Sequence, residues 1–174
     1  MKRLLPINKH PRNNLPVHSS KKRTESNFVL AFGRAYSQDF LKDSDNYSLG
    51  IAREFQINGF GIADLVSVLI TPKKLAVHAF EMKMGDWRRA IAQAYRYKYF
   101  SDSAFVVLPP HEALKAKESL SVFRSINVGL LSFDKTEFCI EKIFIPRKEK
   151  PLSSNAYSKA LSLLAQQFKS LPFS

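Results

Sequence analysis

Two acids and one lysine are spaced so that they could bind a metal ion together. Glu81 and Lys83 lie two residues apart in an apolar stretch, and Asp64 lies in the apolar stretch before it. Side chains two apart on a strand share a face, so Glu81 and Lys83 are expected to project together. If the two stretches pair as antiparallel strands, Asp64 reaches the same edge as Glu81. Two carboxylates and the backbone carbonyl of Met82 then form the hard-oxygen environment that Mg²⁺ prefers.

The lysine adds the chemistry that a phosphodiester needs. Next to a bound divalent ion, the Lys83 ammonium could orient the attacking water or stabilise charge on the phosphate oxygens. The anionic oxygens of a phosphodiester repel hydroxide, and its leaving alkoxide must be neutralised. Asp64, Glu81 and Lys83 are therefore predicted to be catalytic residues of phosphodiester hydrolysis.

The ordinary alternative is a surface ion pair on an edge strand. Val77, Ala79, Phe80 and Met82 surround Glu81 with apolar side chains. This composition indicates a central strand, where a charge is costly unless it has a use. The stretch also holds the only Glu-x-Lys or Asp-x-Lys of the chain.

Turn signals define the strands that would position these residues. Residues 58–61, Asn-Gly-Phe-Gly, predict a hairpin turn between a strand over 50–55 and one over 62–70. Thr-Pro-Lys-Lys at 71–74 predicts the next turn, and a third strand follows over 75–83.

A helix is predicted after the third strand. Asp86 is a good N-cap, and residues 87–100 contain no Gly or Pro and are rich in Ala, Arg and Gln. One side of this helix could meet phosphates, although a solvated face is the ordinary interpretation. The polar residues on that side are Arg89, Gln93, Arg96 and Tyr97.

The remaining elements predict an α/β fold. They are a helix capped by Thr24, a strand over 104–108, a helix over 112–123, strands over 128–133 and 138–145, and a helix over 156–168. The later strand-helix-strand units need crossovers, which predicts a mixed sheet flanked by helices. The chain of 174 residues, 45% hydrophobic, is expected to form one domain over 24–174. Residues 1–23, with three prolines and seven Lys or Arg, are expected to be a disordered basic arm.

The charge favours a polyanionic partner. Lys and Arg number 27 against 15 Asp and Glu, a formal charge of +12. Nucleic acid is the natural partner, with an acidic protein, an anionic membrane face or a solvated basic surface as alternatives. No apolar run is long enough to cross a bilayer, so we expect a cytoplasmic protein. The single cysteine, Cys139, fits a reducing compartment and is expected to be a small buried hydrophobe.

These motifs resemble those of the PD-(D/E)XK nucleases, the restriction-endonuclease-like superfamily. Asp64 matches the second-motif aspartate, residues 81–83 match the E-x-K, and Ala63 stands where the family name has proline. Residues 59–64 and 93–97 resemble the G-x(4)-D and Q-x(3)-Y motifs of the exonuclease branch.

The resemblance covers roughly residues 24–133 and implies an αβββαβ core with a restriction-endonuclease-like sheet. It implies a nuclease acting on DNA with Mg²⁺ or Mn²⁺ and with no organic cofactor. A catalytically silent DNA-binding module with the same fold is the alternative. Paired cuts on duplex DNA often need two active sites, which leaves a homodimer open.

The resemblance also assigns roles beyond the central three residues. It implies that Gln93 and Tyr97 support the site or touch DNA. We assign Gln93 to catalysis and Tyr97 to DNA binding, together with Arg89 and Arg96 of the polar helix face described above. Glu25 matches the first-motif acid, a metal ligand through water, although Glu54 is close enough to the hairpin to be that acid instead.

Overall fold

The computed structural model describes residues 3–4, 8–9, 20–43, 48–71 and 74–169. Its elements along the chain are β1 (Arg3–Leu4), β2 (Asn8–Lys9), α1 (Ser20–Asp43), β3 (Ser48–Ile57), β4 (Gly61–Thr71), β5 (Lys74–Met82), α2 (Trp87–Tyr97), β6 (Ser103–Leu108), α3 (Pro110–Lys117), α4 (Leu120–Ile126), β7 (Gly129–Asp134), β8 (Cys139–Phe144) and α5 (Ser154–Gln167).

One mixed sheet organises the chain. Its long strands lie in the order β3-β4-β5-β6-β7-β8, and the short β1 and β2 pair in parallel with β3. The pairs β3/β4, β4/β5 and β7/β8 are antiparallel, whereas β5/β6 and β6/β7 are parallel. The predicted α/β class with a mixed sheet and flanking helices is confirmed.

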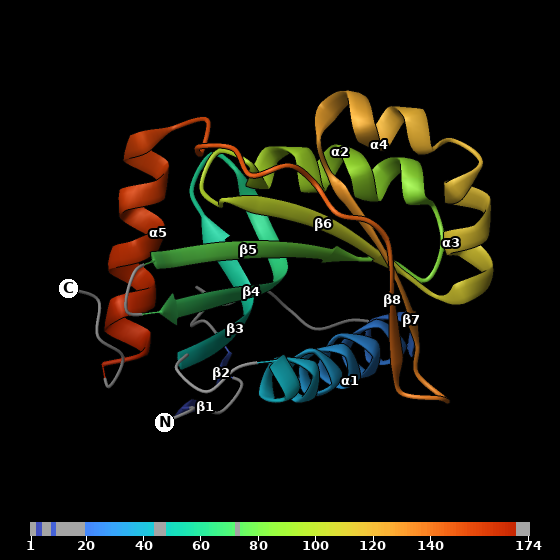
Figure 1. Cartoon of the computed structure of the whole chain (residues 1–174), viewed down its shortest axis with the longest axis horizontal. Helices are drawn as coiled ribbons and strands as arrows, with labels where there is room; N and C mark the ends of the chain where they lie inside the picture. The colour runs from blue at the N-terminus through green and yellow to red at the C-terminus, as the bar shows by residue number, and fades with distance from the viewer. Residues whose placement is uncertain (1–2, 5–7, 10–19, 44–47, 72–73, 170–174) are drawn as a thin grey trace.

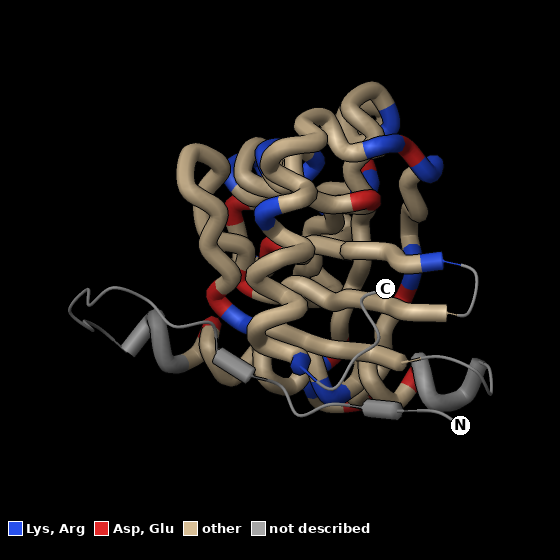
Figure 2. The backbone as a smooth tube through the Cα atoms, turned by 90° about the vertical axis from the view of Figure 1, so that its left-hand side faces the viewer, with Lys and Arg blue, Asp and Glu red and all other residues tan. Residues whose placement is uncertain are grey.

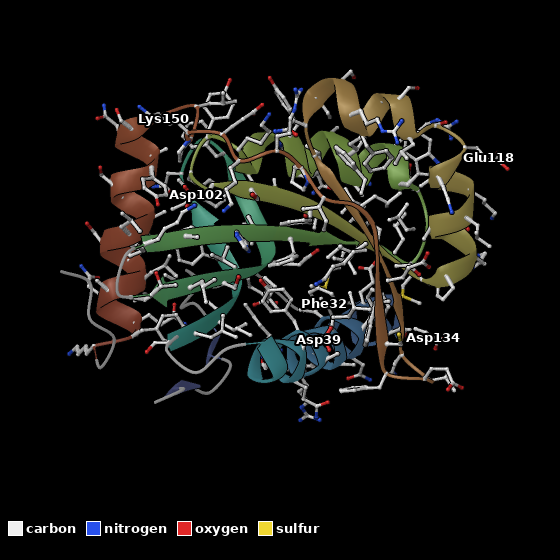
Figure 3. All side chains as sticks on the ribbon, in the orientation of Figure 1. Phe32, Asp39, Asp102, Glu118, Asp134 and Lys150 are labelled. Atoms are coloured by element: carbon white, nitrogen blue, oxygen red, sulfur yellow. The ribbon has the colours of Figure 1, made fainter. Side chains whose placement is uncertain are left out.

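Helices cover both faces of the sheet (Figure 1). On one face, Phe28 and Phe32 of α1 pack against Leu65 and Phe80, and Figure 3 labels Phe32 between helix and sheet. The opposite face is covered by α2 to α5, whose buried residues include Ala90 and other small side chains. Small residues let α2 lie close to the sheet, which brings its side chains within reach of β4 and β5. Figure 2 shows that charged positions gather mainly on helices, turns and strand ends.

The first helix begins earlier than predicted. It starts at Ser20, so Thr24 lies inside α1 and is not its N-cap. Lys and Arg at 21–23 are good helix formers and no proline interrupts them, so the helix extends into the basic segment. Residues 20–23 of the predicted arm lie in α1, and the short strands β1 and β2 also lie within the arm. The other arm residues lie outside the described residues.

Two further predictions are wrong. The single helix over 112–123 is two helices, α3 and α4, separated at Glu118 and Ser119. Ala116 and Phe123 both lie in the core, and the break lets each helix turn its own buried side inward. Cys139 is exposed, because it starts the edge strand β8. Among the helices of the described residues, none is long and apolar enough to cross a membrane.

Candidate active site

The site forms where β4 separates from β5. Their antiparallel ladder ends at the pair Leu65 and Phe80, so the next register position sets Asp64 opposite Glu81. Instead of continuing the ladder, the Asp64 carboxylate accepts a hydrogen bond from the Met82 N–H at 2.8 Å. In a regular antiparallel ladder, the Met82 N–H would donate to a backbone carbonyl of β4. Here it donates to the Asp64 side chain, and the two strands separate at Asp64 and Glu81.

Strand β4 also changes its packing at Asp64. Ala63 packs in the core under α2, whereas Leu65 packs in the core under α1. Residues two apart on a regular strand share a face, so the strand must be distorted between them. The β3/β4 pairing skips Glu54 and Asp64, and Glu54 has a left-handed backbone with φ 53°. The distortion turns the Asp64 side chain toward β5.

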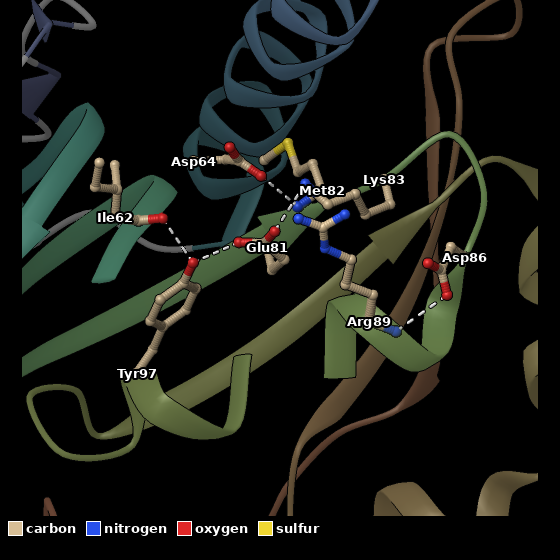
Figure 4. Close-up of polar contacts among 8 residues, drawn as sticks. All are labelled: Ile62, Asp64, Glu81, Met82, Lys83, Asp86, Arg89 and Tyr97. Atoms are coloured by element: carbon tan, nitrogen blue, oxygen red, sulfur yellow. Dashed lines mark hydrogen bonds and ion pairs between the residues drawn. The ribbon is translucent and has the colours of Figure 1, made fainter. Parts of the chain in front are cut away.

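Glu81 and Lys83 meet as predicted for side chains two apart. The Lys83 Nζ lies 2.9 Å from the Glu81 Oε1 (Figure 4). Glu81 is almost fully buried, with 1% of its side chain exposed, while 22% of the Lys83 side chain remains exposed. The ammonium therefore lies between a buried carboxylate and solvent.

Tyr97 of α2 holds the second oxygen of Glu81. Its hydroxyl contacts the Glu81 Oε2 and also lies 2.6 Å from the Ile62 carbonyl oxygen (Figure 4). A hydroxyl carries one hydrogen, so Tyr97 can donate to only one of these two acceptors at a time. Tyr97 is fully buried, and the prediction that it touches DNA is wrong. The reason is that its ring lies in the core under α2 and its hydroxyl points at the acids.

The two acids hold their protons more strongly than ordinary carboxyls. Burial, and then the negative charge of Glu81, raise the pKa of Asp64 to about 7, although Lys83 and the Met82 N–H act the other way. Burial also raises the pKa of Glu81, against the lowering effects of Lys83 and Tyr97. Two acids confined together in this way resist carrying two negative charges unless further positive charge arrives.

Lys83 also holds its proton more strongly than an ordinary lysine. Burial lowers its pKa, but the charges of Glu81 and Asp64 outweigh burial and leave the pKa above its usual value. The lysine is therefore a permanent cation at neutral pH.

Glu25 and Glu54 approach the site from different elements. Glu25, half-buried on α1, contributes to the raised pKa values of both Asp64 and Lys83, which places it within electrostatic range. Glu54 lies across from Asp64 on β3 and has one buried carboxylate oxygen. The charge of Glu25 therefore acts on the site, and the strand register sets Glu54 opposite Asp64.

The polar residues of α2 have different surroundings. Gln93 is half-buried, and its Oε1 is buried without a hydrogen-bond partner in the described structure. Arg89 and Arg96 are exposed; Figure 4 shows the Arg89 side chain extending from the start of α2 in the direction of Glu81. The positive charge of Arg96 lowers the pKa of Glu81, so it also acts on the site. The catalytic and DNA-binding roles of these three stay predictions.

The acids provide part of a metal site. Among the described side chains, no three His, Cys, Asp or Glu residues are grouped as a complete metal cluster. Asp64 and Glu81 supply two carboxylates, and both would be stabilised in their charged forms by a nearby cation. The donor set therefore fits a hard divalent ion that takes its other ligands from backbone, water or substrate.

Sequence reasoning missed the backbone partners of the site. The Met82 N–H and the Ile62 carbonyl are visible only once the break in the β4/β5 ladder is known. The Gly-rich turn before β4 was the available signal, since Gly61 has φ 99° at the first residue of that strand.

Comparisons of the chain with protein-family models, with curated proteins and with solved structures find no match.

Proposed function

We propose that this protein is a Mg²⁺- or Mn²⁺-dependent nuclease that hydrolyses phosphodiester bonds in DNA. The observation that carries the proposal is the convergence of Asp64, Glu81 and Lys83 where β4 leaves β5. Buried acids with raised pKa values next to a lysine are costly to the fold and are typical of functional sites. The element order α1, β3 to β5, α2 and β6 also matches the restriction-endonuclease-like core that the sequence motifs imply.

Each residue has a role in this proposal. Asp64 and Glu81 would hold the ion, with the Met82 carbonyl as a third ligand and Glu25 acting through water. When bound, the ion supplies Lewis-acid stabilisation of the phosphate and lowers the pKa of water. Lys83 keeps its proton and presents a fixed positive charge to the phosphate oxygens.

The residues of α2 support this arrangement. Tyr97 would position the Glu81 carboxylate through the contact of its hydroxyl with Oε2. The exposed Arg89 and Arg96 would contact the DNA backbone. Gln93, one helical turn before Tyr97, would place its amide beside the same acids.

A DNA-binding protein with this fold but without the reaction is the second candidate. The observation that favours it is the Lys83 to Glu81 contact, because the ammonium takes an oxygen that a metal ligand would use. The ion pair with Lys83 could then balance the charge of Glu81 without a metal ion.

Cleavage assays separate the two candidates. The full chain is incubated with plasmid, linear duplex, single-stranded and branched DNA in Mg²⁺ or Mn²⁺, with EDTA as the metal-free condition. We expect cleavage that EDTA abolishes and that Glu81→Gln or Lys83→Met reduces by roughly 100-fold or more. Glu81→Gln keeps the shape of the side chain and an acceptor for Tyr97, so folding should be retained.

Matched controls are Glu118→Gln and Lys117→Met, which remove the same charges at exposed positions of the α3 end. They should cleave like the wild type. Intact DNA with every substrate and ion, together with gel shifts that survive Glu81→Gln, would favour the silent binding module. Equal cleavage by wild type and Glu81→Gln would assign the activity to a contaminant.

A further inference from the structure

A hollow lies at the other end of β5 from the candidate active site. It has a volume of about 550 Å³, within the range of small-ligand sites. Lys74, at the start of β5, lines it, and the seven residue-to-residue steps from Lys74 to Glu81 span roughly 23 Å of extended strand. The opposite wall comes from the loop between β8 and α5 and from the first turn of α5. We call this hollow the lysine groove.

Three lysines give the groove its charge. Lys74, Lys148 and Lys150 line it, and all three are exposed. Within the described part of the chain, none of the three forms an ion pair with a carboxylate. Figure 2 shows a Lys or Arg position beside the grey turn, at the start of β5.

The two acids that line the groove are engaged elsewhere. Asp102 accepts hydrogen bonds from the Val77 N–H at 2.7 Å and from the Tyr157 hydroxyl at 3.0 Å. Glu149 forms an ion pair with Lys98 at 3.0 Å, and its pKa lies below the usual value because of hydrogen bonds from Asn127 and Lys98. Both acids therefore satisfy groups of the protein, and the lysines remain available to a ligand.

The loop that carries two of the lysines is held at both ends. Two hydrogen bonds join the Asn127 side chain to the backbone of Arg147. The Asn127 amide donates to the Arg147 carbonyl at 2.9 Å and accepts from the Arg147 N–H at 2.8 Å. At the other end, the N–H groups of Leu152 and Ser153 donate to the carbonyls of the two residues that directly follow α2. Lys148 and Lys150 thus start from a fixed backbone, which reduces the entropy lost on binding.

The lining of the groove favours a phosphate with an attached planar group. Tyr157, from the first turn of α5, offers an aromatic ring, and Pro151 adds apolar surface. The N-terminal end of α5 contributes a partial positive charge to the same wall.

We infer that the lysine groove binds a phosphate ester, supplied either by a free nucleotide or by a nucleic-acid strand. Lysine ammonium groups act as point charges for phosphate, and the aromatic wall can stack with a base. The groove is separate from Asp64 and Glu81, so this inference does not require the proposed nuclease activity.

Binding measurements in EDTA test the inference without any contribution from metal or cleavage. The probes are AMP, by calorimetry, and a fluorescein-labelled oligothymidylate, by anisotropy. The groove variant carries Lys74→Gln, Lys148→Gln and Lys150→Gln, and the control variant carries the same change at the exposed lysines Lys117, Lys135 and Lys142. Both variants lose three positive charges, so a general effect of net charge is matched.

We expect the groove variant to bind at least one probe about 10-fold more weakly than the control variant, with a shallower salt dependence. A loss for both probes identifies the phosphate ester itself, and a loss for the oligonucleotide alone identifies a strand as its source. Equal binding by the two variants, or no binding of either probe to the wild type, would overturn the inference. Cleavage by the groove variant then reports on the nuclease proposal separately.

Discussion

At the scale of single residues, the site depends on how Glu81 is shared between two neighbours. Lys83 contacts one carboxylate oxygen and Tyr97 the other. Both lower the pKa of Glu81 against the effect of burial, so both favour the charged form that a metal ligand needs. In the proposed function, Tyr97 is therefore a positioning residue that acts through Glu81.

Tyr97→Phe tests that role. Without the hydroxyl, burial dominates and Glu81 keeps its proton to higher pH, so we expect Mn²⁺ affinity at neutral pH to fall about 10-fold. The affinity should recover as the pH is raised, which a purely structural effect would not cause. Calorimetric Mn²⁺ titrations at several pH values measure this. Tyr95→Phe, at an exposed position of the same helix, is the control; unchanged affinity in Tyr97→Phe would contradict the role.

His78 gives a pH prediction outside the site. Burial lowers its pKa from the usual 6.5 to about 4, and its Nδ1 lies 3.1 Å from the Tyr36 hydroxyl, as expected for a structural histidine. Below pH 6.5 the unfolded chain takes up a proton that the folded protein does not accept until about pH 4. Stability from this group is thus complete above pH 6.5 and decreases as the pH falls to 4, by roughly 3 kcal/mol at most.

Urea unfolding of the wild type and of His78→Phe measures that contribution. The wild type should lose more stability than the variant between pH 6.5 and 4. Parallel pH profiles for the two proteins would show that His78 is not the responsible group.

At the scale of elements, α2 must be fixed for Tyr97 to reach Glu81. Its N-cap is Asp86, whose carboxylate accepts from the Arg89 N–H at 3.2 Å and whose backbone is left-handed, with φ 50°. Aspartate and asparagine are the residues that tolerate this backbone and also cap a helix.

Asp86→Ala should therefore destabilise the protein by about 1 kcal/mol or more, since it loses the cap and strains the backbone. Asp86→Asn is the matched variant and should stay within a few tenths of a kcal/mol of the wild type. Thermal melts compare the two. Equal melting temperatures for Asp86→Ala and Asp86→Asn would mean that this cap does not stabilise α2.

Sequence patterns predicted most elements because the signals were local. The turn at 58–61, the cap at Asp86 and the apolar runs of β4 to β7 all appear where expected. The break between α3 and α4 was not predictable, since neither Gly nor Pro marks it and tertiary packing decides it. The position of Asp64 opposite Glu81 followed from antiparallel strands, whereas the burial of Tyr97 depended on how α2 crosses the sheet.

At the scale of the whole molecule, a chain with a formal charge of +12 carries the buried Glu81 and the half-buried Asp64 at its candidate site. In the proposed function this field would attract DNA, and the acids would repel the phosphate unless a cation lies between them. Binding of duplex DNA to Glu81→Gln should weaken with salt, with a log-log slope of about −2.7 or steeper if three or more phosphates are contacted. Anisotropy titrations at increasing NaCl measure the slope. A slope near zero would argue against contacts with the phosphate backbone.

The central claim is that Asp64 and Glu81 share one divalent ion beside Lys83. Anomalous diffraction from crystals of the full chain soaked in Mn²⁺ tests it most directly. We expect a manganese peak within bonding distance of both carboxylates in the wild type, and its loss in Glu81→Gln. Well-ordered crystals that place the ion elsewhere would contradict the claim. So would crystals that show no manganese peak and retain the ion pair between Lys83 and Glu81.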